Sequence, residues 1–429
     1  MPAPPPTPAP DPPLPAQATP PRADSPADAI DGLSSLLAPV EPERVPLHLA
    51  AGRVLAQPLL SDRDSPPITV SAMDGYALRL ADAPAFASTG LPVLAESRIG
   101  QPPLTHPASP GLVRIVTGAP VPVGSDAVVR VEDTATADAL VRLTIPPERL
   151  TTGLAIRSQG ENARAADPIA PAGTIITAPL AAALATFGSA ANAAGTTVRR
   201  RVRVAILTTG DELADPADPA PPPWRIRDSN GPALLAFLSP RPWLQPLEPR
   251  RIPDDPAALA GALASALDSA DAILFTGGVS MGHRDFLPYV LARAGVRTIF
   301  HTVPQRPGKP ILGAVAPATA TLPPRPILGL PGNPVSVMVT ARRIALPVLA
   351  TLAGLNLDPP PAVTLADPDG ATLNLWWHRL VTLGPDGRAS LLSGRGSGDV
   401  PAAARSSGFV ELPPGTSGPG PWPYHAWNA

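Results

Sequence analysis

Cysteine is absent from this chain, and aromatic residues and lysine are scarce. The 429 residues include no Cys and a single lysine, Lys309, and only 4% of them are Phe, Trp or Tyr. Without cysteine the protein can form no disulfide bond, no cysteine-ligated zinc site and no thiol nucleophile. The formal net charge of −2 lacks the basic excess of nucleic-acid-binding proteins, so we expect no nucleic-acid partner.

The rest of the composition is that of a folded protein with many loops. Hydrophobic residues make up 44% of the chain, which excludes global disorder, and its 65 prolines favour loops. The length predicts about two to four domains, each large enough to bury a core.

The N-terminal segment differs from the remainder. Residues 1–24 alternate Pro and Ala with hardly any large apolar side chain, so we expect a disordered tail. This start lacks the basic residues and apolar core of a signal peptide, and no apolar run approaches membrane-spanning length. We therefore expect a cytoplasmic protein with no membrane partner.

Changes in sequence pattern predict the domain boundaries. Residues 61–150 consist mostly of short β-type runs between turns and predict a small β domain. The flanking residues, 25–60 and 151–197, are expected to lie together as one linker domain. From 198 to 356 strands alternate with helices, which predicts a parallel α/β sheet with right-handed crossovers. Residues 357–429 follow a proline run and predict a C-terminal β domain.

Capping residues predict where two helices begin. We expect Ser25 to cap a helix that opens with Pro26, and Asp254 and Asp255 to cap one that opens with Pro256. The basic run 199–203 is expected to be a solvated strand edge. Other expected elements are strands at 112–116, 127–131, 204–207, 272–275, 297–300 and 327–330 and helices at 178–188, 232–238 and 335–352.

Polar loops follow several of the expected strands. In an open parallel sheet, ligands bind at the carboxyl ends of the strands, where such loops converge. Consecutive glycines allow backbone N–H groups to approach a phosphate closely, and carboxylates suit a divalent cation. These loops therefore predict a phosphorylated ligand with a cation. They are Thr209-Gly210-Asp211-Glu212, Thr276-Gly277-Gly278-Val279-Ser280, the segment around Asp285, the loop of Lys309, and Gly329-Leu330-Pro331-Gly332-Asn333-Pro334.

Two known motifs test this interpretation. The sequence around Lys309 does not match the phosphate-binding loop of nucleotide hydrolases, because Val303 stands where glycine is needed and Pro310 follows the lysine. Gly278-Val279-Ser280-Met281-Gly282 matches the nucleophile elbow of serine hydrolases, which leaves a hydrolase as an alternative. The chain has no His-Gly oxyanion motif, and Pro288 would fall within the helix of the elbow. The histidines that could complete a triad are His301, His378 and His425.

Taken together, the loops resemble the molybdopterin molybdenumtransferase family, of the bacterial MoeA and gephyrin E-domain type. The resemblance runs from about residue 25 to the C-terminus, and the block from 199 to about 356 also resembles the molybdopterin adenylyltransferase fold. The matching stretches are Ser71-Ala72-Met73-Asp74-Gly75-Tyr76-Ala77, Thr117-Gly118-Ala119-Pro120, Pro171-Ala172-Gly173-Thr174, Thr209-Gly210-Asp211-Glu212-Leu213, Gly277-Gly278-Val279-Ser280, Pro307-Gly308-Lys309-Pro310 and Gly329-Leu330-Pro331-Gly332-Asn333-Pro334-Val335-Ser336.

The resemblance implies a fold and a reaction. The fold would be multidomain α/β plus β, with a central three-layer α/β domain, a small β domain, an elongated dimerisation domain and a C-terminal β domain. The protein would be a homodimer that takes adenylylated molybdopterin and molybdate, cleaves the pyrophosphate with Mg²⁺, and releases AMP and molybdenum cofactor. Contacts with a molybdopterin adenylyltransferase and with a recipient molybdoenzyme or its chaperone would follow.

The resemblance also implies roles for particular residues. Glu212 and Asp285 would hold the metal or position water. The other expected catalytic residues are Asp74, Thr117, Asp255 and Lys309. The residues expected to bind the substrate are Gly210, Asp211, Gly277, Gly278, Val279, Ser280, Arg306, Gly308, Pro331, Gly332, Asn333 and, less closely matched, Ser397.

The sequence departs from the family pattern at two positions. Asn162 stands where the family has Asp, in Gly160-Glu161-Asn162, and Arg306 stands where the family often has lysine. Arginine keeps the positive charge, whereas asparagine removes the carboxylate that the family has in that loop. A third reading is a non-catalytic scaffold related to gephyrin, for which the Pro-rich tail would be the partner-binding segment.

Overall fold

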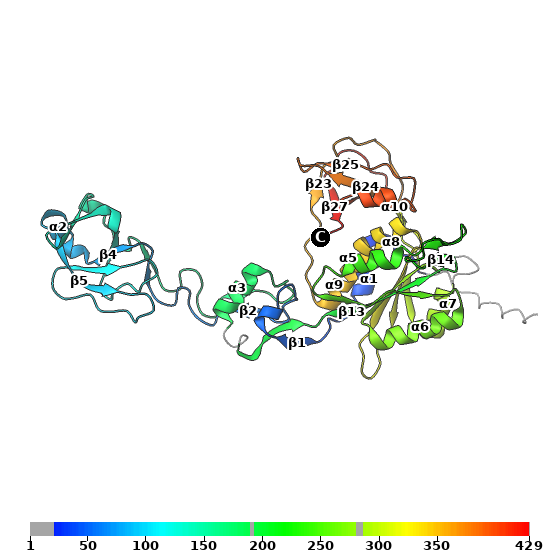
Figure 1. Ribbon diagram of the computed structural model, residues 1–429, viewed down its shortest axis with the longest axis horizontal. Helices are drawn as coiled ribbons and strands as arrows, with labels where there is room; N and C mark the ends of the chain where they lie inside the picture. Colours follow the sequence, from blue (N-terminus) through cyan, green and yellow to red (C-terminus); the bar gives the residue numbers. More distant parts are fainter. Residues whose placement is uncertain (1–20, 189–192, 280–285, 429) are drawn as a thin grey trace, which may run out of the picture. The chain divides into compact units, whose positions relative to one another are not determined.

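The chain divides into two compact units, drawn in Figure 1. The structure, a computed structural model, describes residues 21–188, 193–279 and 286–428. Unit 1 comprises residues 1–57, 172–178 and 195–429, and unit 2 comprises residues 58–171 and 179–194. This division is coarser than the five-part division expected from the sequence, which stays a prediction.

The centre of unit 1 is a mixed sheet of seven strands. Along its main path the order is β16-β13-β18-β22-β21-β19, and β17 also pairs with β13. The strands are β13 (Val202–Thr209), β16 (Leu244–Pro246), β17 (Arg250–Ile252), β18 (Ala272–Thr276), β19 (Arg297–Phe300), β21 (Leu312–Ala316) and β22 (Arg325–Leu330).

Helices cover both faces of this sheet, which gives three layers (Figure 1). Because side chains alternate along a strand, Val204 and Ile206 of β13 pack into one core while Ala205 and Leu207 pack into the other. The first core is closed by α1 (Pro26–Ser34), α5 (Asn230–Leu238), α8 (Pro334–Thr340), the π-helical turn η5 (Ala341–Ala345) and α9 (Leu346–Ala353), and the second by α6 (Pro256–Ser269) and α7 (Leu287–Arg293).

The expectation of an all-parallel sheet is wrong at one edge. β13, β16, β17, β18 and β22 run parallel, but β21 is antiparallel to β22, and β19 is antiparallel to β21. The connections 301–311 and 317–324 contain no helix. A parallel pair needs a crossover of about a dozen or more residues, usually helical, so these connections favour antiparallel pairing. β21 was not among the strands expected from the sequence.

The expected helix at 335–352 forms, with a π-helical turn in its middle. It extends from Pro334 to Ala353 and ends at Gly354, whose φ of 61° is left-handed. The helix is long and apolar enough to cross a membrane, contrary to the expectation that no such segment exists. However, 72% of its most apolar window is buried inside the protein, as in a core helix.

A second sheet of unit 1 belongs mainly to the C-terminal segment, but it includes one strand from the α/β segment. Its main path is β20-β24-β26-β27-β23, and β25 pairs with β24. β20 pairs in parallel with β24, so the loop that carries Lys309 is tied to the C-terminal sheet. The elements are β20 (Gln305–Arg306), β23 (Ala362–Val363), β24 (Trp376–Leu383), β25 (Ala389–Leu391), α10 (Val400–Arg405), β26 (Gly408–Leu412) and β27 (Trp422–Ala426).

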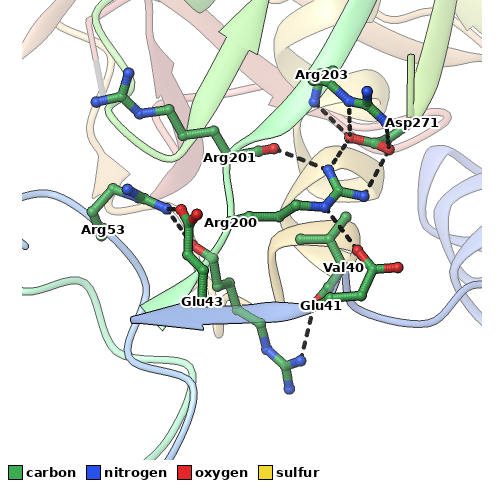
Figure 2. Close-up of polar contacts among 9 residues, drawn as sticks. Val40, Glu41, Glu43, Arg53, Arg200, Arg201, Arg203 and Asp271 are labelled. Atoms are coloured by element: carbon green, nitrogen blue, oxygen red, sulfur yellow. Dashed lines mark hydrogen bonds and ion pairs between the residues drawn. The ribbon is translucent and has the colours of Figure 1, made fainter. Parts of the chain in front are cut away.

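The basic run 199–203 was expected to be a solvated strand edge, but it is the centre of an ion-pair network (Figure 2). It extends from the last residue of β12 (Thr196–Arg199), which pairs with β1 (Pro42–Val45), to the first residues of β13. Arg200 binds both Glu41 and Asp271, and Arg203 also binds Asp271. Arg201, by contrast, is exposed, and its side chain points away from these contacts. The run therefore joins the two-stranded ribbon to the start of β18.

Unit 2 contains a six-stranded sheet in the order β7-β4-β6-β5-β9-β8, and the strands expected at 112–116 and 127–131 are β6 and β7. Two-stranded pairings join β2 to β11 and β3 to β10. The elements are β2 (Leu59–Leu60), β3 (Val70–Ser71), β4 (Gly75–Leu78), α2 (Ala83–Ser88), β5 (Leu91–Ser97), β6 (Leu112–Ile115), β7 (Ala127–Arg130), β8 (Thr134–Ala137), β9 (Leu140–Leu143), β10 (Ile156–Arg157), β11 (Pro168–Ala170) and α3 (Ala178–Phe187).

Candidate functional site

A groove of about 1110 Å³ lies in unit 1 at the carboxyl ends of β13, β18 and β22. The loops after these three strands form one wall, and residues of β24 and of the segment 392–397 form another. The loop after β20 also lines it. The expected site residues that line the groove are Gly210, Glu212, Gly277, Gly278, Val279, Arg306, Gly308, Lys309, Pro331, Gly332, Asn333 and Ser397.

Two glycines after β18 bring three strand ends together. Gly277 and Gly278 have φ values of 84° and 64°, which side-chain-bearing residues rarely adopt. A Cβ on Gly277 would lie 2.5 Å from the Thr209 carbonyl oxygen, so only glycine fits against the end of β13. The Gly277 N–H also donates to the Leu330 carbonyl, 3.3 Å away. The turn is thus packed closely against β13 and β22.

The loop before α8 presents a polar side chain to the groove. Asn333 occupies the N-cap position, but its side chain makes no capping hydrogen bond and is exposed. The next turn is held from two sides, because the Val335 N–H donates to the Ser397 carbonyl (3.0 Å) and Asn230 Nδ2 donates to the Gly332 carbonyl (2.8 Å). Asn333 is therefore available to a ligand on a fixed backbone.

The loop of Lys309 is closely packed at Gly308 and carries two exposed cationic head groups. A Cβ on Gly308 would lie 2.5 Å from Thr340 Cγ2, and Gln305 Nε2 donates to the Gly308 carbonyl at 2.9 Å. Arg306 and Lys309 are both exposed. Among the residues that the structure describes, neither head group forms a hydrogen bond or an ion pair. Two exposed positive charges with no acidic partner in the described ranges favour an anionic ligand.

Two carboxylates line the groove, one in the loop after β13 and one in the turn before α6. Glu212 lines the groove, and so does Asp254, which the sequence analysis had not chosen. Asp211 does not line it; its Oδ1 accepts the Asp254 N–H, and Asp254 Oδ2 accepts the Asp211 N–H, both at 3.3 Å. Asp255 accepts the Ala258 N–H at 2.7 Å as the N-cap of α6, as its capping pattern predicted. Its expected catalytic role stays a prediction.

Asp74 and Thr117 lie in unit 2 and contact each other directly. Asp74 Oδ1 accepts the Thr117 N–H at 2.7 Å and the Thr117 hydroxyl at 2.8 Å. These two hydrogen bonds hold the pKa of Asp74 below its ordinary value, the backbone N–H being the larger cause. Both residues are exposed, so the arrangement presents an ionised carboxylate at the surface.

The loop that carries Asn162 is also in unit 2. Arg157 Nη2 donates to Asn162 Oδ1 at 2.5 Å, and Glu161 accepts the Ser158 N–H at 3.0 Å. Asn162 Nδ2 is 3.5 Å from Ser65 Oγ. The amide thus takes part in a local network with Arg157.

Several expected residues lie outside the described ranges. They are Ser280, Asp285 and Gly282 of the elbow motif. The three histidines considered for a triad are all buried. His301 Nε2 donates to the Val279 carbonyl (2.9 Å), and His378 Nε2 lies 3.0 Å from Glu411 Oε2.

Some groove residues were missed by sequence reasoning. Trp377 and Arg379 come from β24, and Asn230 comes from the start of α5. Behind Asn230, the buried Asp228 accepts the Thr208 hydroxyl at 2.8 Å and the Asn230 N–H at 3.0 Å. The sequence Asp228-Ser229-Asn230 before a helix carries a capping signal that could have identified this turn.

Two known domain families match this chain. Residues 25–188 match the MoeA N-terminal region (domain I and II), and residues 205–351 match a probable molybdopterin binding domain. The second match contains the loops after β13, β18, β20 and β22 that line the groove, whereas β24 and the segment 392–397 lie outside it.

Similar proteins cover most of the chain. Molybdopterin molybdenumtransferase of Synechococcus elongatus is 34% identical over 88% of this chain and 92% of its own length. That of a Nostoc species is 39% identical over 73% of this chain and 70% of its own length. A crystal structure of the molybdopterin biosynthesis MoeA protein from Pyrococcus horikoshii covers 94% of this chain and all of its own, with a TM-score of 0.76 and 22% identity, and has the same multidomain fold with α/β and β domains. The chain belongs to the molybdopterin molybdenumtransferase family.

Proposed function

We propose that the protein inserts molybdenum from molybdate into adenylylated molybdopterin, cleaving its pyrophosphate and releasing AMP and molybdenum cofactor. The family membership supports this reaction and gives no support to the hydrolase or scaffold alternatives. The observation that carries it is the pair of exposed cations Arg306 and Lys309, which have no partner among the described residues and lie with the glycine turn in one groove.

The chemistry of the groove suits a pyrophosphate. Cleavage of a polyanion requires donors that neutralise charge as the leaving phosphate forms. Arg306 and Lys309 supply positive charge, while Gly277 and Gly278 allow the backbone to approach phosphate oxygens closely. Asn333 adds an uncommitted side-chain amide. We propose that these residues hold the pyrophosphate and that Lys309 contacts the phosphate of AMP.

We also propose that a Mg²⁺ ion binds in this groove. Mg²⁺ prefers oxygen ligands, and Glu212 and Asp254 place carboxylates along the groove wall. Within the described ranges no group of three or more His, Cys, Asp or Glu residues is arranged to hold a metal by itself. Phosphate oxygens would therefore complete the coordination, and Asp285 would be a further ligand. When bound, the ion would supply charge neutralisation for the leaving phosphate.

Asp74 and Thr117 motivate the proposal of a homodimer in which a second subunit completes the site. They lie in unit 2, whereas the groove described above lies in unit 1, and both match family positions. Mixing an Asp74→Ala variant with a Lys309→Met variant tests this idea after subunit exchange. Recovery of AMP release toward a quarter to a half of the wild-type rate supports a shared site. No recovery, with exchange demonstrated, would show that each chain works alone.

The decisive assay measures AMP released from adenylylated molybdopterin with and without molybdate and Mg²⁺. We expect release that depends on both additions and that falls at least about tenfold in Lys309→Met, about 1.4 kcal/mol of lost transition-state stabilisation. Arg201→Ala is the matched control, because Arg201 is exposed and outside the groove. Release that needs neither molybdate nor Lys309 would rule out the proposed reaction.

A cytoplasmic location and contacts with an upstream adenylyltransferase and a downstream molybdoenzyme or chaperone complete the proposal. They follow from a substrate that must be adenylylated before use and a product that must be delivered. Cell fractionation and crosslinking to these partners test them; recovery in the membrane fraction would contradict the location.

A further inference from the structure

An aromatic ring and a guanidinium group lie side by side on the groove wall formed by β24. Trp377 and Arg379 are two residues apart on this strand and therefore on the same face. The Arg379 guanidinium carbon lies 4.2 Å from the centroid of the Trp377 ring. Both residues line the groove. The contact is a cation–π pair at the surface where the substrate is expected to bind.

Arg379 is held in this position by a carboxylate. Its Nη1 and Nη2 donate to the two oxygens of Asp369 at 2.7 and 2.5 Å. The Arg379 hydrogen bonds lower the pKa of Asp369 to about 2, so the pair remains charged at any physiological pH. Because its charge is compensated, Arg379 is a support for the ring and a poor candidate for binding phosphate.

Trp377 is next to Arg306, one of the two exposed cations of the groove. In the β20–β24 pairing, Trp377 is in register with Arg306, so the two side chains project from the same face. The ring is half-buried and packs partly against the apolar core of the C-terminal sheet. Its indole N–H has no hydrogen-bond partner in the described part of the chain and is not among the buried unpaired atoms. That N–H is therefore within reach of a ligand.

We infer that Trp377, supported by Arg379 and Asp369, binds a planar heteroaromatic ring of the substrate, while Arg306 and Lys309 bind its phosphates. This inference rests on the proposed function, because adenylylated molybdopterin carries such rings at both ends, an adenine and a pterin. Stacking on tryptophan recognises either ring by its π face. Trp377 would be a specificity-determining residue that positions the pyrophosphate over the glycine turn.

The test compares a ligand that has both a ring and a phosphate with one that has only the phosphate and one that has only the ring. Calorimetry would measure binding of AMP, of ribose 5-phosphate and of a 6-hydroxymethylpterin to the wild type and to Trp377→Phe and Trp377→Leu. We expect Trp377→Leu to weaken one ring-bearing ligand at least about fivefold and to leave ribose 5-phosphate unchanged, with Trp377→Phe in between. Loss for AMP identifies the adenine; loss for the pterin identifies the pterin.

Trp376→Leu is the matched control, because Trp376 is the neighbouring residue on the opposite face of β24, is also half-buried and does not line the groove. In steady-state assays Trp377→Leu should raise the KM for the adenylylated substrate more than it lowers kcat. Equal binding of every ligand by wild type and Trp377→Leu would overturn the inference, as would an equal loss for ribose 5-phosphate. If ring binding depends on Trp377 but the wild type releases no AMP, the role of Trp377 in ring binding is supported and the proposed reaction is contradicted.

Discussion

Arg200 and Asp271 form a two-pronged ion pair, with Nη1 2.5 Å from Oδ2 and Nη2 2.9 Å from Oδ1 (Figure 2). Burial disfavours the charged form of Asp271, but the hydrogen bonds from Arg200 and Arg203 outweigh it, so the pKa of Asp271 is lowered. The Arg200 Nε also donates to Glu41 at 2.7 Å. One side chain thus joins the residue before β1 to the residue before β18.

Arg200→Ala should destabilise unit 1. It removes both ion pairs and leaves Asp271, whose side chain is 10% exposed, with Arg203 as its remaining cation. Breaking a mostly buried pair from one side costs about 2 kcal/mol or more. Arg201→Ala removes an exposed side chain and should change the unfolding free energy by less than about 0.5 kcal/mol. Urea unfolding of both variants measures the difference, and equal midpoints would show that the network contributes nothing.

Stability should fall as the solution becomes acidic, with His425 as one cause. This side chain is buried and stacks on Phe409, with ring centroids 4.9 Å apart. Burial lowers the pKa of His425 to about 3 from its ordinary value of 6.5. Below pH 6.5 the unfolded state therefore binds a proton that the folded state rejects, so stability decreases between pH 6.5 and pH 3.

His425→Phe should reduce this pH dependence. At about pH 5 protonation of His425 in the unfolded state lowers the free energy of unfolding by about 2 kcal/mol, and the variant would not show this decrease. Glu411, whose pKa is about 2, would still contribute a loss below pH 4.5 in both proteins. Melting temperatures at pH 7.5 and pH 5 provide the measurement. Identical differences in wild type and variant would mean that His425 is protonated in the folded state.

Lys309→Arg should fold normally and still lose most activity. The head group is exposed and unpaired among the described residues, so the fold does not depend on it. If the phosphate requires a compact ammonium, the broad guanidinium should reduce AMP release about tenfold, or about 1.4 kcal/mol. Lys309→Met should be slower still, while Arg306→Lys, which restores the residue common in the family, should retain most activity. Wild-type rates in Lys309→Arg would show that only charge matters at this position.

Asn162→Asp should be tolerated and should leave activity equal or higher. Asp keeps an oxygen acceptor for Arg157, and the contact to Ser65 that it alters is long, at 3.5 Å. The change restores the carboxylate of the family pattern. AMP release and melting temperature together provide the check, with Asn162→Ala as the comparison. A large loss of activity in a stable Asn162→Asp protein would mean that this loop works through its amide.

The elements that the sequence predicted best are those determined by local pattern. β13, β18 and β22 are buried apolar runs followed by glycine loops, so both the strands and the groove at their ends could be expected. Ser25 caps α1 because its side chain and neighbouring proline act within one turn. The same reasoning expected both Asp254 and Asp255 to cap α6. Asp255 does so, but Asp254 lines the groove.

What the sequence did not predict depends on contacts between distant segments. β20 is two residues long, and its partner β24 begins about 70 residues later, so nothing local marks Arg306 and Trp377 as neighbours. The basic run 199–203 was assigned to solvent because a charge run by itself carries no sign of Glu41 or Asp271. The antiparallel edge of the sheet likewise follows from the helix-free connections between β19, β21 and β22. These connections could be recognised only once the pairing of β21 with its two neighbours was known.

A sole lysine at the edge of the groove gives this protein a built-in spectroscopic handle. Lys309 carries the single ε-amine of the chain, and its head group is exposed. Reductive methylation with isotope-labelled formaldehyde keeps the positive charge while adding an NMR-visible dimethylamine. Because Lys309 is the one lysine of the sequence, the spectrum would contain one lysine resonance, and its chemical shift would follow groove occupancy without any substitution.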